Sequence, residues 1–426
     1  MRFVITSFGS LGDLNPYLGL GRALRARGHD VVLALPRLYV EYAEAAGLKA
    51  QAVRPDIDPD ARDVLRKVMD PFRGAEYLIR DWIMPNVESA YQDLDTLVRD
   101  DDVLVSHPLT YAAPVLAERR GLRWASTILA PLGFFSRKDA PLMAVHPVME
   151  TLQRHLPGFY NQLVPLARLA TKRWSPQVAA LRQKLGLPRG EDPVHGGQFS
   201  PYLNLAMFSP LLAQPQDDWP PKTVATGAVS YDAVHGGMPR HLEEFLDAGT
   251  PPIVFTLGSS AVASVHSPRF YQASIDAARD VGARAVLLVG KYDGHRPETG
   301  GRGDVFVAEW APHSELFARA SVIVHQAGAG TLHTALASGR PMLIVPFAHD
   351  QGDNAVRSRR LGVARVLFPG HYRRKAVAKH LADLLSAEFR NRAEEVGESI
   401  RAEHGALRAS EALEALAGLR GTSTAA

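Results

Sequence analysis

Residues 322–332 read VIVHQAGAGTL, a short apolar run followed at once by a histidine and two spaced glycines. An apolar run bounded by glycine is typical of a buried strand, and the glycines suit a turn that leads into a helix. At a helix start the backbone N–H groups lack helical partners and the helix dipole favours negative charge, so such a turn can hold phosphate oxygens. We therefore expect an anion site at His325, Gly328, Gly330 and Thr331. The alternative is an ordinary turn whose glycines serve packing alone.

The next apolar run, at residues 342–346, ends in the polar loop FAHDQGDNA at residues 347–355. In open α/β sheets, ligands bind at the carboxyl ends of parallel strands. The carboxylate of Asp350 and the amide of Gln351 offer the acceptors and donors that the vicinal hydroxyls of a hexose require. We predict that this loop binds a sugar. The alternative is a solvated loop in which Asp353 caps a helix.

Apolar runs alternate with helical stretches along the rest of the chain. The second half has them at 253–257, 285–289, 305–308, 322–324 and 342–346, and the first half at 3–7, 31–35, 103–106 and 124–129. This alternation favours parallel sheets covered by helices. In the opening unit we expect a helix that starts at Pro16, is capped by Asn15 and stops at Gly28, which leaves Asp13 on the preceding loop.

These patterns predict an α/β chain of two facing Rossmann-like domains with parallel sheets and a cleft between them. A length of 426 residues exceeds what one hydrophobic core usually supports. Prolines crowd between residues 210 and 252 and mark an interdomain linker. We place the first domain at 1–215, the linker at 216–250 and the second domain at 251–390. A C-terminal helix at 391–420 is expected to pack back on the first domain.

Composition excludes several classes of function. The chain has 48 Lys and Arg against 45 Asp and Glu, a balance that gives no reason to expect nucleic acid as a partner. It has no cysteine, which excludes disulfides, thiolate metal sites and a cysteine nucleophile. No long apolar stretch predicts a signal peptide or a membrane span. We expect a cytoplasmic protein without stable membrane insertion; a peripheral contact with a membrane stays open, although no amphipathic anchor is obvious. The oligomeric state stays open.

Two weak motifs argue against a metal and a nicotinamide cofactor. Asp56 and Asp58, and Asp58 and Asp60, have the spacing of a divalent-metal pair, but they lie in a proline-containing loop that no strand delivers. Gly9 and Gly12 have an incomplete dinucleotide-loop spacing, and no acidic residue ends the following strand. We therefore expect no metal and no cofactor.

The run from His325 to Thr331, followed by Asp350 and Gln351, resembles the donor signature of the UDP-glycosyltransferase superfamily, glycosyltransferase family 1. The segments FTLGSS at 255–260 and WAPH at 310–313 agree with it, so the resemblance covers both halves. It implies the GT-B fold and metal-independent transfer from a nucleotide sugar. By this resemblance Trp310 stacks on the nucleobase, and Ser259 joins the turn in binding the diphosphate.

The resemblance is closest to the bacterial antibiotic, sterol-like and rhamnolipid transferases. Plant members have a glutamate for the ribose hydroxyls where this chain has His333, which leaves the choice between UDP and dTDP open. Plant members also carry their catalytic histidine in a loop like GDLNP at 12–16, where this chain has Asp13, as bacterial relatives do. The supporting aspartate of the plant enzymes is replaced by His107. Our hypothesis is that Asp13 deprotonates the acceptor and that His107 orients it or shares the proton.

Both catalytic residues have alternative interpretations. An acidic side chain at the position of Asp13 can simply complement the helix dipole, and His107 can be a hydrogen-bonded residue at a strand end. The acceptor side is marked only by apolar and aromatic side chains in segments 64–100 and 131–175. Candidates for an apolar pocket, with core packing as the alternative for each, are Trp82, Met84, Phe134, Phe135 and Met143.

The predicted function is inverting transfer of a hexose from a UDP- or dTDP-sugar to a hydroxyl of a hydrophobic small molecule, such as a lipid, a sterol-like compound, a polyketide or a flavonoid. Two other readings stay open. A nucleotide-sugar epimerase of the same architecture needs no acceptor pocket, and a noncatalytic nucleotide-sugar-binding protein binds the donor without turnover.

Overall fold

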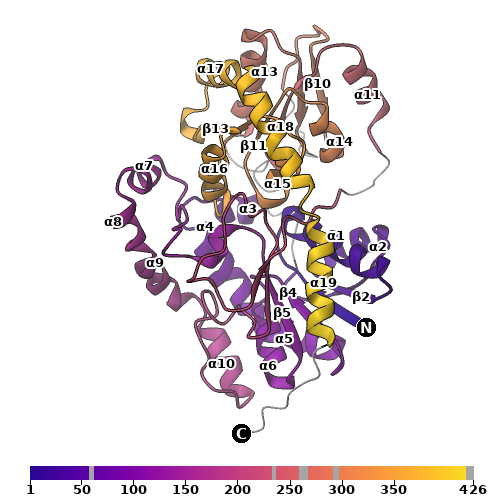
Figure 1. Cartoon of the computed structure of the whole chain (residues 1–426), viewed down its shortest axis with the longest axis vertical. Coiled ribbons are helices and arrows are strands. Elements are labelled where there is room, and N and C mark those ends of the chain that lie inside the picture. The colour runs from indigo at the N-terminus through magenta and orange to yellow at the C-terminus, as the bar shows by residue number, and fades with distance from the viewer. Residues whose placement is uncertain (57–61, 233–236, 259–266, 291–296, 419–426) are drawn as a thin grey trace.

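The computed structural model describes residues 1–56, 62–232, 237–258, 267–290 and 297–418 (Figure 1). Within these residues the strands form two sheets. The strands of the first are β1 (Arg2–Thr6), β2 (Asp30–Leu35), β3 (Lys49–Ala52), β4 (Val103–Ser106), β5 (Arg123–Ile128), β6 (Leu203–Ala206) and β7 (Thr223–Ala225). Those of the second are β8 (Ile253–Thr256), β9 (Ala285–Leu288), β10 (Val305–Ala308), β11 (Val322–His325), β12 (Met342–Ile344) and β13 (Ala364–Val366).

Each sheet is parallel and doubly wound. Among the described residues the strand orders are β3-β2-β1-β4-β5-β6-β7 and β10-β9-β8-β11-β12-β13. The pairings are parallel, with Ile5 opposite Leu33 in the first sheet and Val324 opposite Phe255 in the second. The chain order reverses beside β1 and beside β8, so each sheet has the crevice in which such folds bind ligands. The predicted α/β architecture of two Rossmann-like units is confirmed.

Helices cover both faces of each sheet (Figure 1). In the first half they are α1 (Leu11–Ala26), α2 (Val40–Ala45), α3 (Arg62–Val68), α4 (Gly74–Glu76), α5 (Val87–Leu97), α6 (Ala112–Arg120), α7 (Pro147–His155), α8 (Pro157–Asn161), α9 (Leu163–Thr171) and α10 (Pro176–Lys184), with the short turns η1 (Arg37–Tyr39), η2 (Tyr77–Ile83), η3 (Met84–Asn86), η4 (Pro131–Phe134) and η5 (Lys172–Trp174). In the second half they are α11 (Arg240–Asp247), α13 (Ser267–Asp280), α14 (His313–Ala318), α15 (Ala329–Ala337), α16 (Gln351–Arg360), η7 (Pro369–His371), α17 (Arg374–Leu384), α18 (Ala387–Arg401) and α19 (Gly405–Gly418).

The start of α1 differs from the prediction. The helix begins at Leu11, one turn before the expected start, and Pro16 lies inside it. Ser10 is the N-cap: its hydroxyl accepts the N–H of Gly12 at 3.3 Å, and the Asp13 carboxylate accepts the N–H of Ser10 at 2.8 Å. This reciprocal capping box satisfies two free donors and outweighs the start signal of Asn15 and Pro16. Asp13 therefore belongs to the first helical turn and not to the loop.

The C-terminal stretch is two helices instead of one. α18 packs on the second half, where Ala393, Val396 and Ile400 join the core. After a break at His404, whose φ is 53°, α19 packs against α1 and buries Leu413 and Leu416 in the core of the first half (Figure 1). The chain thus crosses back between the halves at residues 402–404.

The range predicted as a linker, 216–250, is partly structured. It contains β7, which pairs with β6 of the first sheet, and α11, whose Leu242 and Leu246 lie in the core of the second half. The predicted domain boundaries stay predictions, but the passage between the two sheets falls between Ala225 and Arg240.

Candidate active site

Two helix starts, one from each half, meet at the junction between the sheets. The starts of α1 and α15 are in backbone contact: a Cβ on Gly330 would lie 3.2 Å from the carbonyl oxygen of Gly12 and 3.3 Å from its Cα. Beside them Ala329 and Leu11 pack on the same core. Pro16 has no N–H, so the carbonyl of Gly12 also lacks its regular helical donor. A side chain at 330 would press on the backbone of Gly12, so glycine suits this close approach.

Asp13 lies at this junction, and Ser10 of the same turn fixes its carboxylate. Its Oδ2 accepts the N–H of Ser10 at 2.8 Å and the hydroxyl of Ser10 at 3.0 Å. A side chain at Gly9, whose φ is 136°, would overlap the carboxylate. The Asp13 side chain remains 37% exposed, so its other oxygen, Oδ1, can meet a ligand.

His107 approaches that second oxygen from the end of β4. Its Nε2 lies 3.7 Å from Oδ1 of Asp13, and its Nδ1 accepts the N–H of Leu109 at 3.0 Å. Because Nδ1 is an acceptor, the neutral ring carries its proton on Nε2, facing the carboxylate. Burial raises the pKa of Asp13, but the nearby His107 imidazole, together with the hydrogen bonds from Ser10, outweighs burial and lowers it below its usual value. The site therefore presents an ionised carboxylate backed by an imidazole N–H.

The start of α15 has no carboxylate of its own. Gly328 is its N-cap and no side chain caps the helix. The N–H groups of Ala329, Gly330 and Thr331 belong to the first turn, where a helix supplies no acceptors. The preceding Ala327 has a φ of 66°, a left-handed conformation that is costly for alanine. This conformation sets the direction in which the chain enters the helix. The turn can thus bind an anion with several N–H donors at once.

His325 lies behind this turn and is fully buried. Its Nδ1 accepts the N–H of Ala327 at 3.2 Å, and its Nε2 lies 3.2 Å from Sδ of Met342. Burial, with a further contribution from His313, lowers its pKa to about 3, so the ring is neutral. The ring holds Ala327 in its strained conformation. That His325 also donates to a diphosphate stays a prediction.

The predicted sugar loop lies next to the turn. Asp350 is the N-cap of α16, and its Oδ2 accepts the amide of Asn354 at 2.8 Å. The same amide donates to the carbonyl of Ala327 at 2.9 Å, so Asn354 joins the loop to the turn. Gln351 closes the loop, because its Oε1 accepts the N–H groups of Phe347 at 2.8 Å and Ala348 at 3.2 Å. Its amide nitrogen alone is left for a ligand.

The loop and Asp13 influence each other across the junction. Burial, and after it the charge of Asp13, raises the pKa of Asp350 to about 7. Burial lowers the pKa of His349, and the charge of Asp13 opposes that effect. Two carboxylates, one from each half, therefore have pKa values displaced in opposite directions, a pattern that clusters at catalytic sites.

Sequence reasoning missed two buried amides in this region. Asn354 could have been found because it lies one helical turn after Asp350. Gln326 lies between Gly258 and Gly328, where a Cβ would meet its amide nitrogen. Its Oε1 is buried and has no hydrogen-bond partner among the described residues. A buried unpaired acceptor next to an anion site is a candidate ligand contact.

The remaining predicted donor residues divide into three cases. Ser259 lies outside the described residues. Trp310 follows β10 and is 37% exposed, so its ring is accessible to a nucleobase. His333 is buried with both nitrogens engaged: Nδ1 lies 2.8 Å from the carbonyl of Ala329, and Nε2 accepts the N–H of Ser209 at 3.3 Å. It fixes α15 to the first half.

A buried ionic cluster fastens α16 to the first half. Asp353 is not the N-cap that the sequence left open; its Oδ2 pairs with Nε of Arg357 at 2.8 Å, and its Oδ1 accepts the N–H of Leu142 at 3.0 Å. Arg357 also binds Asp139 and the carbonyl of Leu212, at 3.1 Å for the latter. Breaking a buried pair of this kind costs about 3–5 kcal/mol. The helix that begins at the predicted sugar loop is thus fixed relative to the first half.

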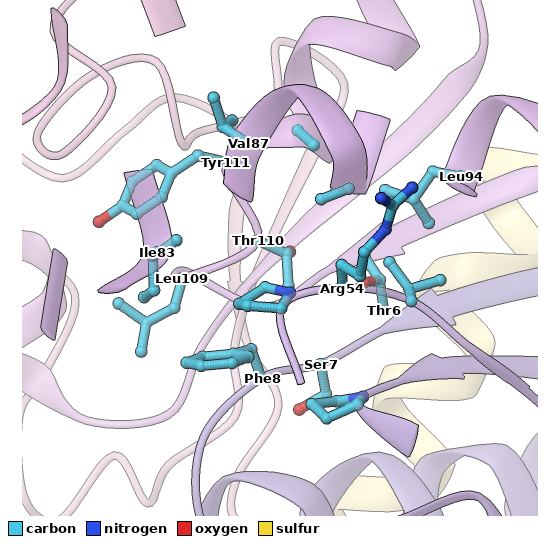
Figure 2. A pocket seen from close by; sticks show the side chains of 15 residues that line it. Thr6, Ser7, Phe8, Arg54, Ile83, Val87, Leu94, Leu109, Thr110 and Tyr111 are labelled. Carbon is cyan, nitrogen blue, oxygen red and sulfur yellow. The ribbon is translucent and has the colours of Figure 1, made fainter. Parts of the chain in front are cut away.

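A small pocket opens at the carboxyl ends of the first-sheet strands (Figure 2). Its volume is about 20 Å³, room for little more than one water. Its walls include Phe8, Ile83, Leu109 and Tyr111. Phe8 comes directly before the Gly9–Asp13 turn, and Leu109 follows His107. The pocket therefore lies on the same strand edge as the two predicted catalytic residues.

The five predicted acceptor residues do not form one surface. Trp82 packs edge-on against Phe8, with ring centroids 5.7 Å apart, and so supports a residue of the pocket wall without lining the pocket itself. Met84 is fully buried in the core, and Phe134 stacks on Trp219 at 4.1 Å. These positions favour the core-packing alternative, and an acceptor contact at either residue stays a prediction. Both are core residues because their neighbours fill all the space around them. Phe135 and Met143 are half-buried beside another cluster, around Tyr160.

The described residues contain neither a candidate metal site nor a candidate membrane-spanning helix. No three His, Asp or Glu side chains there converge as a metal site, and Asp58 and Asp60 of the acidic motif lie outside those residues. Nor does any helix there have the length and apolarity that a membrane span requires.

The chain is similar to known glycosyltransferases over nearly its whole length. Residues 228–393 match the family model of UDP-glucoronosyl and UDP-glucosyl transferases. The O-mycaminosyltylonolide 6-deoxyallosyltransferase of Streptomyces fradiae is 30% identical over 423 residues, which cover 95% of each chain. Among solved structures, the glycotransferase of kitacinnamycin shares the fold, with a TM-score of 0.72, 22% identity and coverage of 97% of this chain and 98% of that one. The glycosyltransferase VinC in complex with dTDP superimposes with a TM-score of 0.68, 20% identity and coverage of 98% and 99%. The chain therefore belongs to the UDP-glycosyltransferase superfamily and is a glycosyltransferase of the GT-B fold.

Proposed function

We propose that this glycosyltransferase moves a hexose from a dTDP- or UDP-sugar to a hydroxyl of a hydrophobic small molecule, with inversion at the anomeric carbon. One observation carries the proposal. The ionised carboxylate of Asp13 lies where the uncapped start of α15 meets α1, and the pKa of Asp350 responds to it from the other half. A base, an anion site and a hydroxyl-binding carboxyl thus surround one junction.

In the proposed reaction, Oδ1 of Asp13 accepts the proton of the acceptor hydroxyl while that oxygen attacks the anomeric carbon. The bond from the anomeric carbon to the diphosphate breaks on the opposite face, and its electron pair stays on the leaving oxygen. Attack opposite the leaving group inverts the configuration. His107 keeps its Nε2 proton and favours the ionised base before transfer.

The leaving diphosphate is stabilised by the N–H groups of Ala329, Gly330 and Thr331 and by the positive end of the α15 dipole. These donors take the place of the positive charge that a metal ion would supply, so we propose a metal-independent reaction without a cofactor. We also place this activity in the cytoplasm.

The relatives favour dTDP as the first nucleotide to test. VinC is described in complex with dTDP, and the similar Streptomyces fradiae protein is named a 6-deoxyallosyltransferase. In this chain His333 is engaged with Ala329 and Ser209, and it offers no carboxylate for a ribose. The nucleoside is therefore expected to be held by Trp310 and by the turn.

The acceptor is expected to enter from the pocket of Phe8, Ile83, Leu109 and Tyr111, which is apolar and lies on the strand edge of Asp13 and His107. Its volume of about 20 Å³ excludes a whole acceptor. Binding therefore requires the walls, which all belong to the first half, to move apart by loop motion of the kind common in such enzymes.

Thermal unfolding with dTDP, UDP, GDP or NADPH tests the donor site. A ligand at 100 times its Kd adds about 2.7 kcal/mol of stability. We expect stabilisation by dTDP or UDP in the wild type, a reduced shift in Trp310→Ala, and a full shift in the control Tyr202→Ala, which removes an exposed aromatic ring elsewhere. Stabilisation by NADPH alone would refute a nucleotide-sugar site.

Product analysis then separates the three functions. With a dTDP-sugar and a panel of apolar alcohols and phenols, the transferase releases dTDP and forms an inverted glycoside. Conversion of the sugar without an acceptor would establish an epimerase. Binding without turnover across the panel, together with unchanged binding in Asp13→Asn, would support a noncatalytic binding protein.

A further inference from the structure

One long segment of the first half carries only positive charge. Residues 151–190, which include most of α7 and all of α8, α9 and α10, contain no Asp or Glu. Their Lys and Arg residues are Arg154, Arg168, Lys172, Arg173, Arg182, Lys184 and Arg189. Because the whole chain carries only +3, the rest of it is net negative. The positive charge of this protein is therefore concentrated in these helices.

Part of this charge has no partner within the protein. Arg182 pairs with Glu118 at 2.7 Å, and Lys184 pairs with Glu88. In contrast, Arg154, Lys172 and Arg173 are exposed and form no ion pair among the described residues. These three cations are free to meet an anionic surface.

Apolar side chains are exposed on the same helices. Each of the following is more than half exposed: Val148, Leu156, Phe159, Leu166 and Leu169. Side chains three or four positions apart share one face of a helix, so Leu166, Leu169 and Arg173 point the same way from α9 and η5. The opposite side of α9 is fixed to the protein, because Val164 is buried and Arg168 donates to the carbonyl of Phe135 at 2.9 Å.

The helices that carry these side chains lie along one outer edge of the molecule (Figure 1). We call the exposed surface of Arg154, Leu156, Phe159, Leu166, Leu169, Lys172 and Arg173 the α7–α9 face. The sequence showed no amphipathic anchor because the face is divided among three short helices, each too short to give a sustained pattern. Such a combined apolar and basic surface exceeds the scattered apolar residues of an ordinary protein surface.

We propose that the α7–α9 face docks on the surface of an anionic lipid bilayer. Leucine and phenylalanine side chains can enter the boundary between headgroups and acyl chains, while flanking Lys and Arg side chains extend to the lipid phosphates. Residues 151–190 contribute no Asp or Glu that would be repelled by such a surface. The docking is peripheral and reversible, and it does not depend on the reaction proposed above.

A second copy of this chain is a poorer occupant. In a symmetric dimer the same patch meets itself, so Arg154, Lys172 and Arg173 of one copy would face the same cations of the other. Like charges brought together in this way repel. Charge complementarity therefore favours an anionic bilayer over self-association.

Co-sedimentation of the full chain with vesicles tests the proposal. We expect binding to vesicles of equal parts phosphatidylcholine and phosphatidylglycerol, little binding to phosphatidylcholine alone, and release as salt is raised. The double variant Lys172→Glu with Arg173→Glu should weaken binding about thirtyfold, which corresponds to about 1 kcal/mol for each cation. Its control is Lys375→Glu with Lys379→Glu, which makes the same change of net charge on exposed positions of α17 in the second half and should bind as the wild type does.

The apolar part is tested separately with Leu166→Ser and Leu169→Ser combined, which should weaken binding, and with Leu407→Ser as an exposed control on α19 that should not. Equal binding to both vesicle types, or equal loss in the two charge-reversed variants, would overturn the proposal. Absence of vesicle binding would also overturn it. One such case is a dimer, seen by sedimentation velocity, that the combined Leu166→Ser and Leu169→Ser variant dissociates. That case would assign the face to self-association.

Discussion

The starts of α1 and α15 have the same arrangement of strand, turn and helix, but only the start of α1 carries a negative charge. Each helix follows a strand inside its sheet, β1 or β11, and each has glycine at its second position, Gly12 or Gly330. At the third position α1 has Asp13 and α15 has Thr331. In α1, Ser10 and Asp13 form a capping box that neutralises the positive end of the helix. In α15 no side chain caps the helix, so the N–H groups are left for an external anion.

In our proposal, the residue at the third position decides what each strand–turn–helix unit does. The carboxylate of Asp13 occupies the helix start and is the proposed base, whereas the hydroxyl of Thr331 leaves the α15 start open to the proposed phosphate. The two units also need each other, because the glycines at their second positions are in contact. The proposed site is therefore assembled only where the two halves meet.

The contrast is tested most severely at Asp13. Asp13→Asn keeps the size of the side chain and removes the base, so the transfer rate should fall by about 10² to 10⁴. Stabilisation by dTDP should persist, because the α15 start is unchanged. The measurements are kcat with a saturating acceptor and the dTDP-induced shift in Tm. An Asn variant that transfers sugar at the wild-type rate would remove Asp13 from the chemistry.

His107 provides the companion variant. His107→Gln retains a side-chain N–H donor near Asp13, whereas His107→Ala removes it. If His107 orients an ionised base, Ala should lower kcat and move the acid limb of the pH profile upward, because the pKa of Asp13 loses the support of the imidazole. Gln should restore much of kcat. Equal behaviour of both variants and the wild type would make His107 a strand-end residue without a catalytic part.

The reverse change, Thr331→Asp, should prevent the α15 start from binding a diphosphate. A carboxylate at this third position would occupy the N–H groups and repel a diphosphate, so affinity for dTDP should fall by at least about tenfold. Without ligand the same variant should be more stable by about 0.3–1 kcal/mol, because an acidic residue complements the helix dipole. Thr331→Asn is the uncharged control. If Asn and Asp weaken dTDP binding equally, charge is not the reason that the start of α15 is open.

Much of the fold could be predicted from the sequence. Parallel strands covered on both faces are continuous apolar runs, so the strands at 103–106 and 305–308 were predicted with the bounds that the structure gives. The predicted start of α1 was wrong because two sequence signals for a helix start compete there. Ser10 with Asp13 is one and Asn15 with Pro16 is the other; the complete capping box and the packing of Leu11 and Leu14 against the core both favour the first.

The site was predictable as a set of neighbours and less so atom by atom. The carboxyl ends of parallel strands must share an edge, which brings the His325–Thr331 turn and Asp350 together. Which side-chain atoms remain available to a ligand depends on hydrogen bonds within the loops, which the sequence does not reveal. The oxygen of Gln351 is used by Phe347 and Ala348, and the His325 nitrogens face Ala327 and Met342. Nor could the sequence separate the fully buried Met84 from the partly buried Trp82, which packs on Phe8, because one helical turn presents both.

The smallest effect tests whether the two halves are electrostatically coupled. The folded protein holds Asp350 protonated up to about pH 7, whereas the unfolded chain ionises it near 3.8. The folded state therefore binds the extra proton, and the contribution of Asp350 to the free energy of unfolding falls as pH rises from 3.8 to about 7 and is flat above. Guanidinium unfolding across this range should show a decline in the wild type relative to Asp350→Asn. In Asp13→Asn the decline should be smaller, because one cause of the raised pKa has been removed. A decline unchanged by Asp13→Asn would mean that burial alone protonates Asp350 and that the start of α1 has no electrostatic influence on the donor half.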